Sequence, residues 1–499
     1  MTTFAGDPDE IIARLVALRA DDPPTHGGRV LSYVYDPGLD ELERLMKRAI
    51  QEVLPVNGLD PTTFRSVGVL ESELVDFVRG LLHGGDDVVG SATSGGTESC
   101  LLAVKTARDA WRAAHPDAGR ARLVAPTTVH AAFQKAAHYF DLVLDLVPVA
   151  PDGTVQAADI AARLGDDVAL VVVSAPNYPF ASLDPVVEVA AETSGRGIPL
   201  HVDACIGGLV LPFWTDDDGV QLPDWDFRVP GVTSMSADLH KFGYAPKGVS
   251  VLLQRGRDLQ RHQYFATTRW PGYPVVNPTI LGSKSASPLA AGWAISQWLG
   301  EAGFAELTAS CQRSTVALRA AIAGIEGLRV VGDPVGPLFA VTSDESVPAE
   351  RRVDPHHWAD AVRRHGFVLQ LQPALRQSDG TVLPSTTHLT ITPVTERALD
   401  ELTAAFAAGA DAVRGVPHVD VAPLLGTLPP LDLATLDADT AWALLTGFGI
   451  GGSAELPDAQ APLVALIEAL PAPVAERLLV ELLGRLVEPR AGAHGEGHF

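Results

Sequence analysis

The sequence predicts an α/β protein built around a largely parallel sheet, and three observations lead to that class. Short apolar runs alternate with helical patterns from about residue 82 to residue 255, which is the arrangement of a parallel sheet with helices on both faces. The chain has 499 residues, enough for two or three domains. Apolar residues make up 46% and charged residues 20%, which excludes a disordered chain and a fibrous repeat.

The strands of this sheet are expected from six short segments that are rich in leucine or β-branched residues and bounded by Gly, Pro, Asp or Ser. They are residues 88–92, 122–125, 142–149, 168–175, 198–204 and 249–253. Helices are expected between them. One begins near Thr97, with apolar residues on one face, and another runs from near His130 to about Tyr139.

Further elements are expected on both sides of the sheet segments. A preceding N-terminal arm carries helical patterns at 40–53 and 71–82. After the sheet, helical patterns at 288–299 and 304–325, followed by short strands, predict a smaller α+β domain. The last part is interrupted by prolines and ends in an amphipathic pattern at 474–487, which predicts a helical C-terminal extension of unknown role. The expected divisions are residues 1–80, 81–285, 286–412 and 413–499.

The charge and the cysteines narrow the classes of partner. Acidic residues outnumber basic ones by 61 to 37, a formal charge of −24, which repels nucleic acid and anionic lipid and favours a small-molecule substrate. No apolar run reaches the ~18 residues of a membrane span, and the acidic N-terminus lacks a secretory pattern, so a cytoplasmic protein without a membrane span is expected. Cys100, Cys205 and Cys311 fit neither a disulfide framework nor a zinc motif, so buried thiols and no metal site are expected.

Polar residues follow several predicted strands, at the edge where open α/β sheets bind ligands. Ser94-Gly-Gly-Thr-Glu-Ser99 lies between the first strand and the helix that begins near Thr97. Two glycines let a backbone approach an anion closely, and a helix N-terminus offers free N–H groups. Gly95, Gly96 and Thr97 are therefore candidates for a phosphate site, although a plain turn is the commoner use of a Gly-Gly pair.

Three titratable residues are candidates for the chemistry. Asp203 ends an apolar strand, where a carboxylate is costly unless a cation such as a protonated ring nitrogen pairs with it; capping of a turn is the alternative. Lys241 lies beside His240 among small and apolar residues, a setting expected to lower the pKa of an amine and make it nucleophilic, whereas an exposed surface lysine is the alternative. His130 opens a helix and is a candidate catalytic residue, whereas a purely structural histidine is the alternative.

Taken together, these segments predict pyridoxal 5'-phosphate as the cofactor. Gly95–Thr97, Asp203 and Lys241 supply, in chain order, an anion site, a partner for the ring nitrogen and a lysine that can form a Schiff base. A dinucleotide site is disfavoured because no G-x-G-x-x-G follows the first strand, and a P-loop because no G-x-x-x-x-G-K-[ST] occurs.

Several motifs between about Gly28 and Val394 resemble those of sphingosine-1-phosphate lyases, within the group II pyridoxal-phosphate decarboxylase superfamily. The most specific is Ser236-Ala-Asp-Leu-His-Lys-Phe-Gly-Tyr-Ala-Pro-Lys-Gly248. The others are Ser94–Ser99, His130-Ala-Ala-Phe-Gln-Lys-Ala-Ala137, Ala175-Pro176 with Asp184-Pro185, and His201-Val-Asp-Ala-Cys205 with Gly207-Gly208. The resemblance implies a fold type I, aspartate aminotransferase-like α/β enzyme with a mixed, mostly parallel sheet. It also implies a homodimer with shared active sites.

The resemblance also implies roles for individual residues. Lys241 would form the Schiff base, Asp203 would pair with the pyridine nitrogen, His130 would stack on one ring face, and Ala204 would lie against the other. Residues implied to hold the phosphate are Gly95, Gly96, Thr97 and His240. No metal ligand is implied.

Four residues are implied to contact the substrate: Tyr244, Lys247, Asn57 and Lys284. Around them the chain departs from the lyase pattern, since Asp60 stands where lyases have histidine and Lys284 where they have arginine. An added carboxylate and a lysine in place of arginine weaken bidentate phosphate recognition. These departures favour a more soluble amine than a long-chain sphingoid base.

The predicted activity is that of a carbon–carbon lyase, a retro-aldol cleavage of a 2-amino-3-hydroxy, phosphorylated substrate through the Lys241 Schiff base. One alternative is an amino-acid decarboxylase of the same superfamily, which releases carbon dioxide. An alternative of another class is a non-catalytic scaffold that keeps the fold. The presence of Lys241, Asp203 and His130 together argues against the scaffold.

Overall fold

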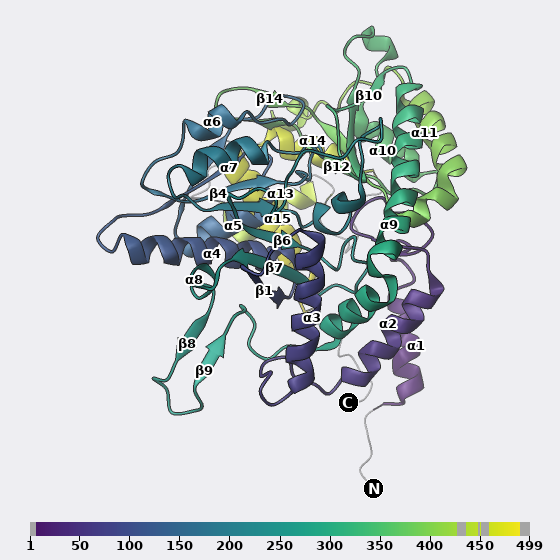
Figure 1. Ribbon diagram of the computed structural model, residues 1–499. Coiled ribbons are helices and arrows are strands. Elements are labelled where there is room, and N and C mark those ends of the chain that lie inside the picture. The colour runs from purple at the N-terminus through teal and green to yellow at the C-terminus, as the bar shows by residue number, and fades with distance from the viewer. Residues whose placement is uncertain (1–5, 427–435, 448–449, 451–458, 490–499) are drawn as a thin grey trace.

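The computed structural model describes residues 6–426, 436–447, 450 and 459–489 (Figure 1). Its largest feature is a seven-stranded sheet in the order β1-β7-β6-β5-β4-β2-β3. The strand β7 runs antiparallel to both β1 and β6, and the other neighbours are parallel. The expected class, α/β with a mixed and mostly parallel sheet, is confirmed. The strands are β1 (Val88–Thr93), β2 (Arg122–Pro126), β3 (Val143–Val147), β4 (Val168–Ser174), β5 (Leu200–Asp203), β6 (Val232–Ala237) and β7 (Ser250–Arg255).

All six predicted strands occur, and the sequence pattern missed one, β6. This strand reads Val-Thr-Ser-Met-Ser-Ala and lacks the apolar run used to find the others. It is nevertheless mostly buried because it lies between β5 and β7. Its serines are satisfied by neighbours rather than by water, since the hydroxyls of Ser234 and Ser236 contact the His201 ring on β5.

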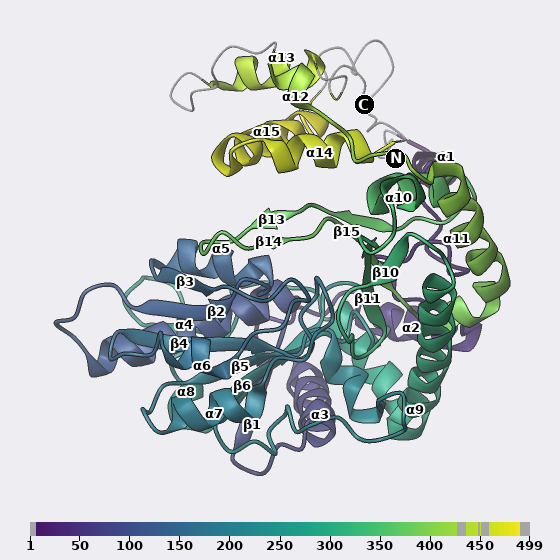
Figure 2. The ribbon, with the colours of Figure 1, turned by 90° about the horizontal axis from the view of Figure 1, so that it is seen from above.

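Helices cover both faces of the sheet, and alternate residues of β4 show which face is which. Leu170 and Val172 pack with α4 (Gly96–Ala114) and α5 (Ala131–Phe140). Val171 and Val173 belong to the core on the other face. That second core also contains side chains of α3 (Arg65–Leu81), α6 (Ala157–Ala161) and α7 (Val186–Ser194). Figure 2 shows the helices on the two sides of the sheet.

The N-terminal arm contains α1 (Pro8–Leu18), α2 (Asp40–Val53) and α3. The bounds of α2 agree with the prediction, whereas α3 begins at Arg65 rather than at residue 71. Leu74 and Val78 of α3 are fully buried in the core beneath the sheet. The arm is therefore anchored to the large sheet by α3.

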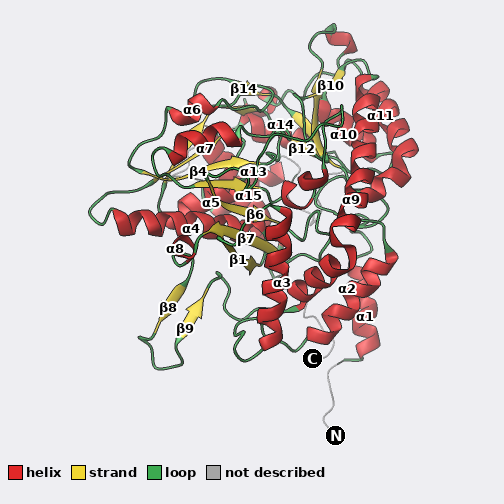
Figure 3. Ribbon diagram, in the orientation of Figure 1, coloured by secondary structure: helices red, strands yellow, loops and turns green. Residues whose placement is uncertain are grey.

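A smaller α+β unit, which we define as the elements from α9 to α11, follows the sheet (Figure 3). The helix α9 (Ser287–Ala323) is interrupted at Gly300, where φ is 53° and ψ is −174°, which agrees with the two helical patterns expected from the sequence. The unit's antiparallel sheet has the order β10-β11-β15-β12. Its elements are β10 (Leu328–Val330), β11 (Leu338–Ser343), α10 (Pro355–Arg363), β12 (Gln370–Gln372), β15 (Thr386–Thr390) and α11 (Leu399–Val413).

Shorter elements connect these units. The hairpin of β8 (Phe265–Thr267) and β9 (Val275–Asn277) projects from the large sheet (Figure 1). A second hairpin of β13 (Leu375–Arg376) and β14 (Val382–Leu383) lies within the smaller unit. The others are α8 (Arg257–Gln260) and the 3₁₀ turns at Gly207–Leu209, Leu211–Phe213, Ala349–Arg351 and Pro393–Ala398.

The C-terminal extension is helical, as expected, and comprises α12 (Ala422–Leu425), α13 (Ala438–Gly447), α14 (Ala461–Ala469) and α15 (Ala472–Leu486). Leu445, Leu466, Leu478 and Leu482 belong to a small apolar core of its own. The extension lies beside the smaller unit (Figure 2), where α14 contacts α10 and β12.

Two expectations about the whole chain can be compared with the structure. Among the helices of the described ranges, none combines the length and the apolar character needed to cross a membrane. Cys100, Cys205 and Cys311 are free and buried, which confirms the prediction of buried thiols. The expected divisions between domains remain a prediction.

Candidate active site

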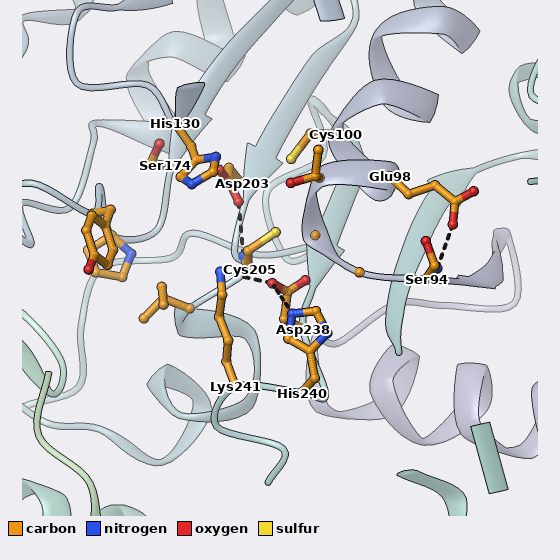
Figure 4. A pocket seen from close by; sticks show the side chains of 16 residues that line it. Ser94, Glu98, Cys100, His130, Ser174, Asp203, Cys205, Asp238, His240 and Lys241 are labelled. Carbon is orange, nitrogen blue, oxygen red and sulfur yellow. Dashed lines mark hydrogen bonds and ion pairs between the residues drawn. The ribbon is translucent and has the colours of Figure 1, made fainter. Parts of the chain in front are cut away.

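A cavity of about 320 Å³ opens where β4, β5 and β6 end and α4 begins (Figure 4). This is the edge of the sheet at which parallel α/β folds bind ligands. The lining residues are Ser94, Gly95, Gly96, Thr97, Glu98, Cys100, His130, Ser174, Pro176, Tyr178, Asp203, Cys205, Ile206, Asp238, His240 and Lys241. The structure thus brings seven of the predicted residues together: Gly95, Gly96, Thr97, His130, Asp203, His240 and Lys241.

The N-terminus of α4 forms one wall of the cavity and has the features of an anion site. No described side chain caps this helix, so N–H groups of its first turn are free to bind an anion. Gly95 has a φ of 149°. A Cβ at Gly95 would lie 2.8 Å from the His240 ring, and one at Gly96 would lie 2.5 Å from the Asp238 carboxylate. The two glycines are therefore required by the close approach of backbone and side chains.

Asp203 faces the same cavity from the end of β5. Its Oδ1 accepts hydrogen bonds from the Cys205 N–H at 3.1 Å and from the Ser236 hydroxyl at 3.3 Å. Its Oδ2 receives no hydrogen bond from any residue in the described ranges, although the side chain is only 8% exposed. Asp203 thus caps a turn with one oxygen, the alternative considered from the sequence, and leaves the other available to a cationic group in the cavity.

Lys241 is held by an ion pair that the sequence analysis did not anticipate. Its Nζ lies 2.9 Å from Oδ2 of Asp238, a residue that is 1% exposed. Burial opposes the charged amine, but the Asp238 carboxylate prevails and raises the pKa of Lys241 well above its usual range. The expectation of a lowered pKa is therefore wrong, because it considered the apolar neighbours and not the adjacent carboxylate.

Asp238 is the most informative residue that the sequence analysis left without a role. Its Oδ1 accepts from the Ser250 hydroxyl at 2.7 Å, and its Oδ2 lies 3.5 Å from Nε2 of His240. Burial raises the pKa of this carboxyl, but the positive charge of Lys241 and the hydrogen bond from His240 outweigh burial, so the pKa is lowered. The signal was present in the sequence, since Asp238 stands three residues before Lys241 in a segment with no other acid.

His130 lies on the other side of the cavity, near Asp203 (Figure 4). It precedes α5, and its Nδ1 accepts a hydrogen bond from the Ala132 N–H at 3.2 Å. The enclosing protein atoms lower the pKa of His130, the carboxylate of Asp203 opposes this effect, and the charge of Lys241 adds to it. The ring is therefore neutral at neutral pH and open to the cavity.

Tyr178 connects the cavity to the smaller unit and was also missed by the sequence analysis. Its hydroxyl donates to Oε1 of Gln370 on β12 at 2.6 Å. Its ring stacks on His388 of β15, with 4.2 Å between the ring centroids. No local pattern predicts these contacts, because they join residues about 200 positions apart in the chain.

Two residues expected at the cofactor or substrate lie outside the cavity lining. Ala204 is fully buried and packs in the core of the large sheet. Tyr244 is also buried and stacks on Phe304, with 6.1 Å between the ring centroids. Neither residue lines the cavity, so the roles that the resemblance implies for Ala204 and Tyr244 remain predictions.

Lys247 is close to the site but does not line the cavity. Its Nζ donates to the carbonyl of His240 at 2.8 Å and lies 4.5 Å from the ring centroid of Tyr35. Burial lowers the pKa of Lys247 to about 8, and the charge of Lys241 contributes to this shift. A lysine with a lowered pKa can exchange protons near neutral pH.

Asn57 and Lys284 lie next to each other, but away from the cavity that contains Lys241. The Gly58 N–H donates to the Lys284 carbonyl at 2.8 Å, and the Lys284 N–H donates to Oδ1 of Asn57 at 3.3 Å. Lys284 lines a hollow bounded by α3, β1 and the β8–β9 hairpin. Within this chain they hold two segments together, and their expected contact with substrate remains a prediction.

His201, next to the site on β5, gives a pH-dependent prediction. The ring is fully buried, and its nitrogens contact the hydroxyls of Ser234 and Ser236. Burial lowers its pKa to about 4, and the carboxylate of Asp203 opposes this shift. Between pH 6.5 and 4 the unfolded chain binds the proton that the folded chain rejects, so stability falls as the pH falls through this window.

We expect His201 to remove about 2 kcal/mol from the free energy of unfolding when the pH is lowered from 7 to 5. Urea unfolding of wild type and His201→Gln at both pH values measures this effect. Between pH 7 and 5 the free energy of unfolding of the variant should fall by about 2 kcal/mol less than that of the wild type. His365→Gln, at an exposed histidine, is the control. Equal pH dependence in wild type and His201→Gln would contradict the prediction.

Comparison with known proteins places this site in a family. Residues 57–324, more than half of the chain, match the family model described as pyridoxal-dependent decarboxylase conserved domain. The chain belongs to the pyridoxal-dependent decarboxylase family. Its cofactor is accordingly pyridoxal 5'-phosphate, as predicted. The matched segment contains the cavity residues described above.

Individual relatives narrow the placement within this decarboxylase family. The chain is 37% identical to sphingosine-1-phosphate lyase of Dictyostelium discoideum over 340 residues, covering 67% of this chain and 63% of that protein. A solved sphingosine-1-phosphate lyase of Burkholderia pseudomallei is 30% identical with a TM-score of 0.75, covering 83% of this chain and 93% of that one. The chain is a sphingosine-1-phosphate lyase-like member of the decarboxylase family.

Other comparisons limit how far that likeness extends. A probable L-tyrosine/L-aspartate decarboxylase of Methanocella arvoryzae is 27% identical over 73% of this chain and 92% of its own length. The chain spans only 63% of the Dictyostelium lyase and 59% of the mouse lyase. Residues 421–485 match a separate family model, "Pyridoxal-dependent enzyme, C-terminal putative HTH domain". The C-terminal extension is thus found with pyridoxal-dependent enzymes and is not a feature of this chain alone.

The geometry of the cavity fits the family's cofactor. An uncapped helix N-terminus, whose glycines leave no room for a Cβ, can receive a phosphate. The free Oδ2 of Asp203 can face a protonated ring nitrogen, and the Nζ of Lys241 enters the same space. The three chemical requirements of pyridoxal phosphate are therefore met in one cavity.

Proposed function

We propose that this decarboxylase-family member is a carbon–carbon lyase that breaks the Cα–Cβ bond of a 2-amino-3-hydroxy substrate. The observation that carries the proposal is that Lys241, Asp203 and the uncapped N-terminus of α4 line one cavity. The likeness to a solved sphingosine-1-phosphate lyase over 93% of that chain supports aldol cleavage. When bound, the cofactor supplies a sink for the electron pair released from the α-carbon.

Each side chain has a task in this proposal. Gly95, Gly96, Thr97 and His240 hold the phosphate at the start of α4. The carboxylate of Asp203 keeps a proton on the ring nitrogen, because a negative charge in a buried site stabilises a neighbouring cation. The Nζ of Lys241 binds the cofactor aldehyde.

Proton transfer in the cavity is assigned to three residues. The Nδ1 of His130 accepts the Ala132 N–H, so in the neutral ring Nε2 carries the proton and donates a hydrogen bond to the oxygen of the substrate hydroxyl. The amine of Lys241, once the substrate amine has displaced it, takes the proton of the substrate hydroxyl and returns it to the α-carbon. Asp238 stabilises the positive charge that Lys241 then carries, because the two groups are 2.9 Å apart in a buried position.

The substrate is proposed to be phosphorylated and more soluble than a long-chain sphingoid base. Lys247 supports an anion near the cavity mouth, since its ammonium lies beside His240. Tyr244, Asn57 and Lys284 remain proposed substrate residues. In this chain they contact other protein segments, so their role requires a rearrangement or a second subunit.

An amino-acid decarboxylase is the second candidate. It is favoured by the Methanocella decarboxylase, which this chain covers over 92% of its length, whereas it covers less than two thirds of the curated lyases. The same cavity residues serve both reactions, because the cofactor stabilises the electron pair whichever bond to the α-carbon breaks.

A product assay distinguishes the two candidates. The holoenzyme is incubated with a 2-amino-3-hydroxyalkyl phosphate and, separately, with a panel of amino acids, and both aldehyde and carbon dioxide are measured. We expect aldehyde from the phosphorylated amine and no carbon dioxide above the level of a Lys241→Ala control. Carbon dioxide without aldehyde would overturn the lyase proposal in favour of the decarboxylase.

We also propose that the working form is a cytoplasmic homodimer. The resemblance to lyases with shared active sites supports a dimer, and the placement of Asn57 and Lys284 away from the Lys241 cavity is consistent with a site completed by a second copy. Light scattering on the purified holoenzyme is expected to give twice the chain mass of 52.6 kDa. A monomer that retains full activity would contradict the dimer.

A further inference from the structure

A second cluster of ligand-type side chains lies outside the cofactor cavity, where the smaller unit meets the C-terminal extension. Asp354 precedes α10 and His356 lies in its first turn. His418 lies in the segment between α11 and α12. Asp354, His356 and His418 each bring one possible ligand atom to within 4.8 Å of the others.

His356 has a nitrogen without a protein partner. The side chain is fully buried. Its Nε2 lies 2.9 Å from the carbonyl of Gln372, and since a carbonyl only accepts, Nε2 carries the proton and donates. Its Nδ1 then has a free lone pair, and no residue in the described ranges bonds to it. A buried acceptor without a partner is costly in a protein and calls for an explanation.

Asp354 and His418 are also held by hydrogen bonds to the atoms that face away from the cluster. Oδ1 of Asp354 accepts from the N–H groups of His356 at 3.0 Å and His357 at 2.9 Å, which leaves Oδ2 turned to the cluster. Nε2 of His418 lies 2.8 Å from Oε2 of Glu468 on α14, which leaves Nδ1 turned to Oδ2 of Asp354 at 2.8 Å. Histidines that bind metals are oriented by a carboxylate or a carbonyl on the far nitrogen in this manner.

We propose that Asp354, His356 and His418 bind one divalent transition-metal ion, with Zn²⁺ as the best match. The ligand atoms are Oδ2 of Asp354, Nδ1 of His356 and Nδ1 of His418. Two imidazoles and a carboxylate suit zinc, which takes four ligands at roughly 2.0–2.2 Å. The side chain of His418 is 39% exposed, so the fourth position is open to water. Binding of the ion replaces the 2.8 Å hydrogen bond between Nδ1 of His418 and Oδ2 of Asp354, and a proton is released.

The ion would connect three parts of the chain. Asp354 and His356 belong to the smaller unit, His418 to the segment that leads into the extension, and Glu468 to the extension itself. Oε1 of Glu468 also accepts from the Ala374 N–H at 2.7 Å and the Ser385 hydroxyl at 2.8 Å. The site is therefore a structural link that fixes the extension on the smaller unit. The prediction of no metal site relied on local cysteine spacing, which does not report ligands that meet only in the folded chain.

The test is zinc binding by the full-length holoenzyme after removal of metals with a chelator. The holoenzyme is used because Cys100, Asp203 and Cys205 also lie within 4.8 Å of one another in the cofactor cavity. We expect one zinc per chain by elemental analysis after dialysis, and a melting temperature that rises on addition of zinc. His356→Ala and His418→Ala should each weaken zinc binding at least ~10-fold, as measured by competition with a chelating dye.

His357→Ala is the matched control, because this neighbouring histidine lies outside the cluster, and it should bind zinc as the wild type does. His418→Ala is the variant least prone to misfolding, since the residue is partly exposed. Circular dichroism compares the folded state of all variants. Absence of stoichiometric zinc in the wild type, or equal zinc affinity in His418→Ala and His357→Ala, would overturn the proposal and leave His418 as a protonated bridge between Asp354 and Glu468.

Discussion

Replacing Lys241 by alanine should lower the turnover of the proposed reaction at least ~10⁴-fold, because no other amine of the described residues lines the cavity and loss of a nucleophile removes a step that binding cannot replace. The wild-type holoenzyme should show a visible band near ~420 nm from the lysine-bound cofactor, and the variant should lack it. After reduction with borohydride, peptide mass spectrometry should find the cofactor ring attached to Lys241.

The folding stability of the Lys241→Ala variant must be controlled separately from its activity. Alanine at position 241 leaves the carboxylate of Asp238 buried without its partner, which can cost about 3–5 kcal/mol of the free energy of unfolding. The double variant Lys241→Ala with Asp238→Asn removes that charge and separates misfolding from lost chemistry. Lys135→Ala, at an exposed lysine of α5, should keep full activity. Cofactor attached to any lysine other than Lys241 would refute the assignment.

Replacing Asp203 by asparagine should lower turnover on the order of 10²–10³-fold, since it removes a preorganised charge from a water-poor site. The amide oxygen of asparagine can still accept from the Cys205 N–H and the Ser236 hydroxyl, so the turn should persist. What is lost is the negative charge that holds a proton on the ring nitrogen. Steady-state kinetics and the visible spectrum of the bound cofactor measure the effect.

The control for Asp203 is Asp117→Asn, at an exposed position after α4, which should leave turnover and spectrum unchanged. Thermal unfolding of Asp203→Asn should resemble that of the wild type, because the hydrogen bonds of the turn are kept. An active Asp203→Asn variant with an unaltered spectrum would show that Asp203 acts only as a turn cap.

The elements that sequence patterns predicted best were those with a strong local signal. The helix α2 and the apolar strand β4 were found because their periodicity is complete within the segment. The strand β6 was missed because its burial comes from β5 and β7 on either side and not from its own composition. The interruption of α9 at Gly300 was visible as two separate helical patterns.

The candidate site shows the same division between local and long-range information. Residues that carry reactive groups could be selected from the sequence, because an acid or a lysine among apolar residues is unusual. The direction of the pKa shift of Lys241 could not, since it depends on the 2.9 Å separation from Asp238. Tyr178 was missed because its partners, Gln370 and His388, belong to a different unit of the fold.

By itself the sequence determined the α/β class and the residue types that suit a pyridoxal-dependent reaction, because both depend on patterns a few residues long. Only the tertiary structure decided that Lys241 and Asp203 face one cavity and that Lys284, which is hydrogen-bonded to Asn57, lines another hollow. It also decided that His356 and His418 meet across two units of the chain. The physical reason is that charge, burial and hydrogen bonding act through distances in space, and those distances are set by packing between segments that are remote in sequence.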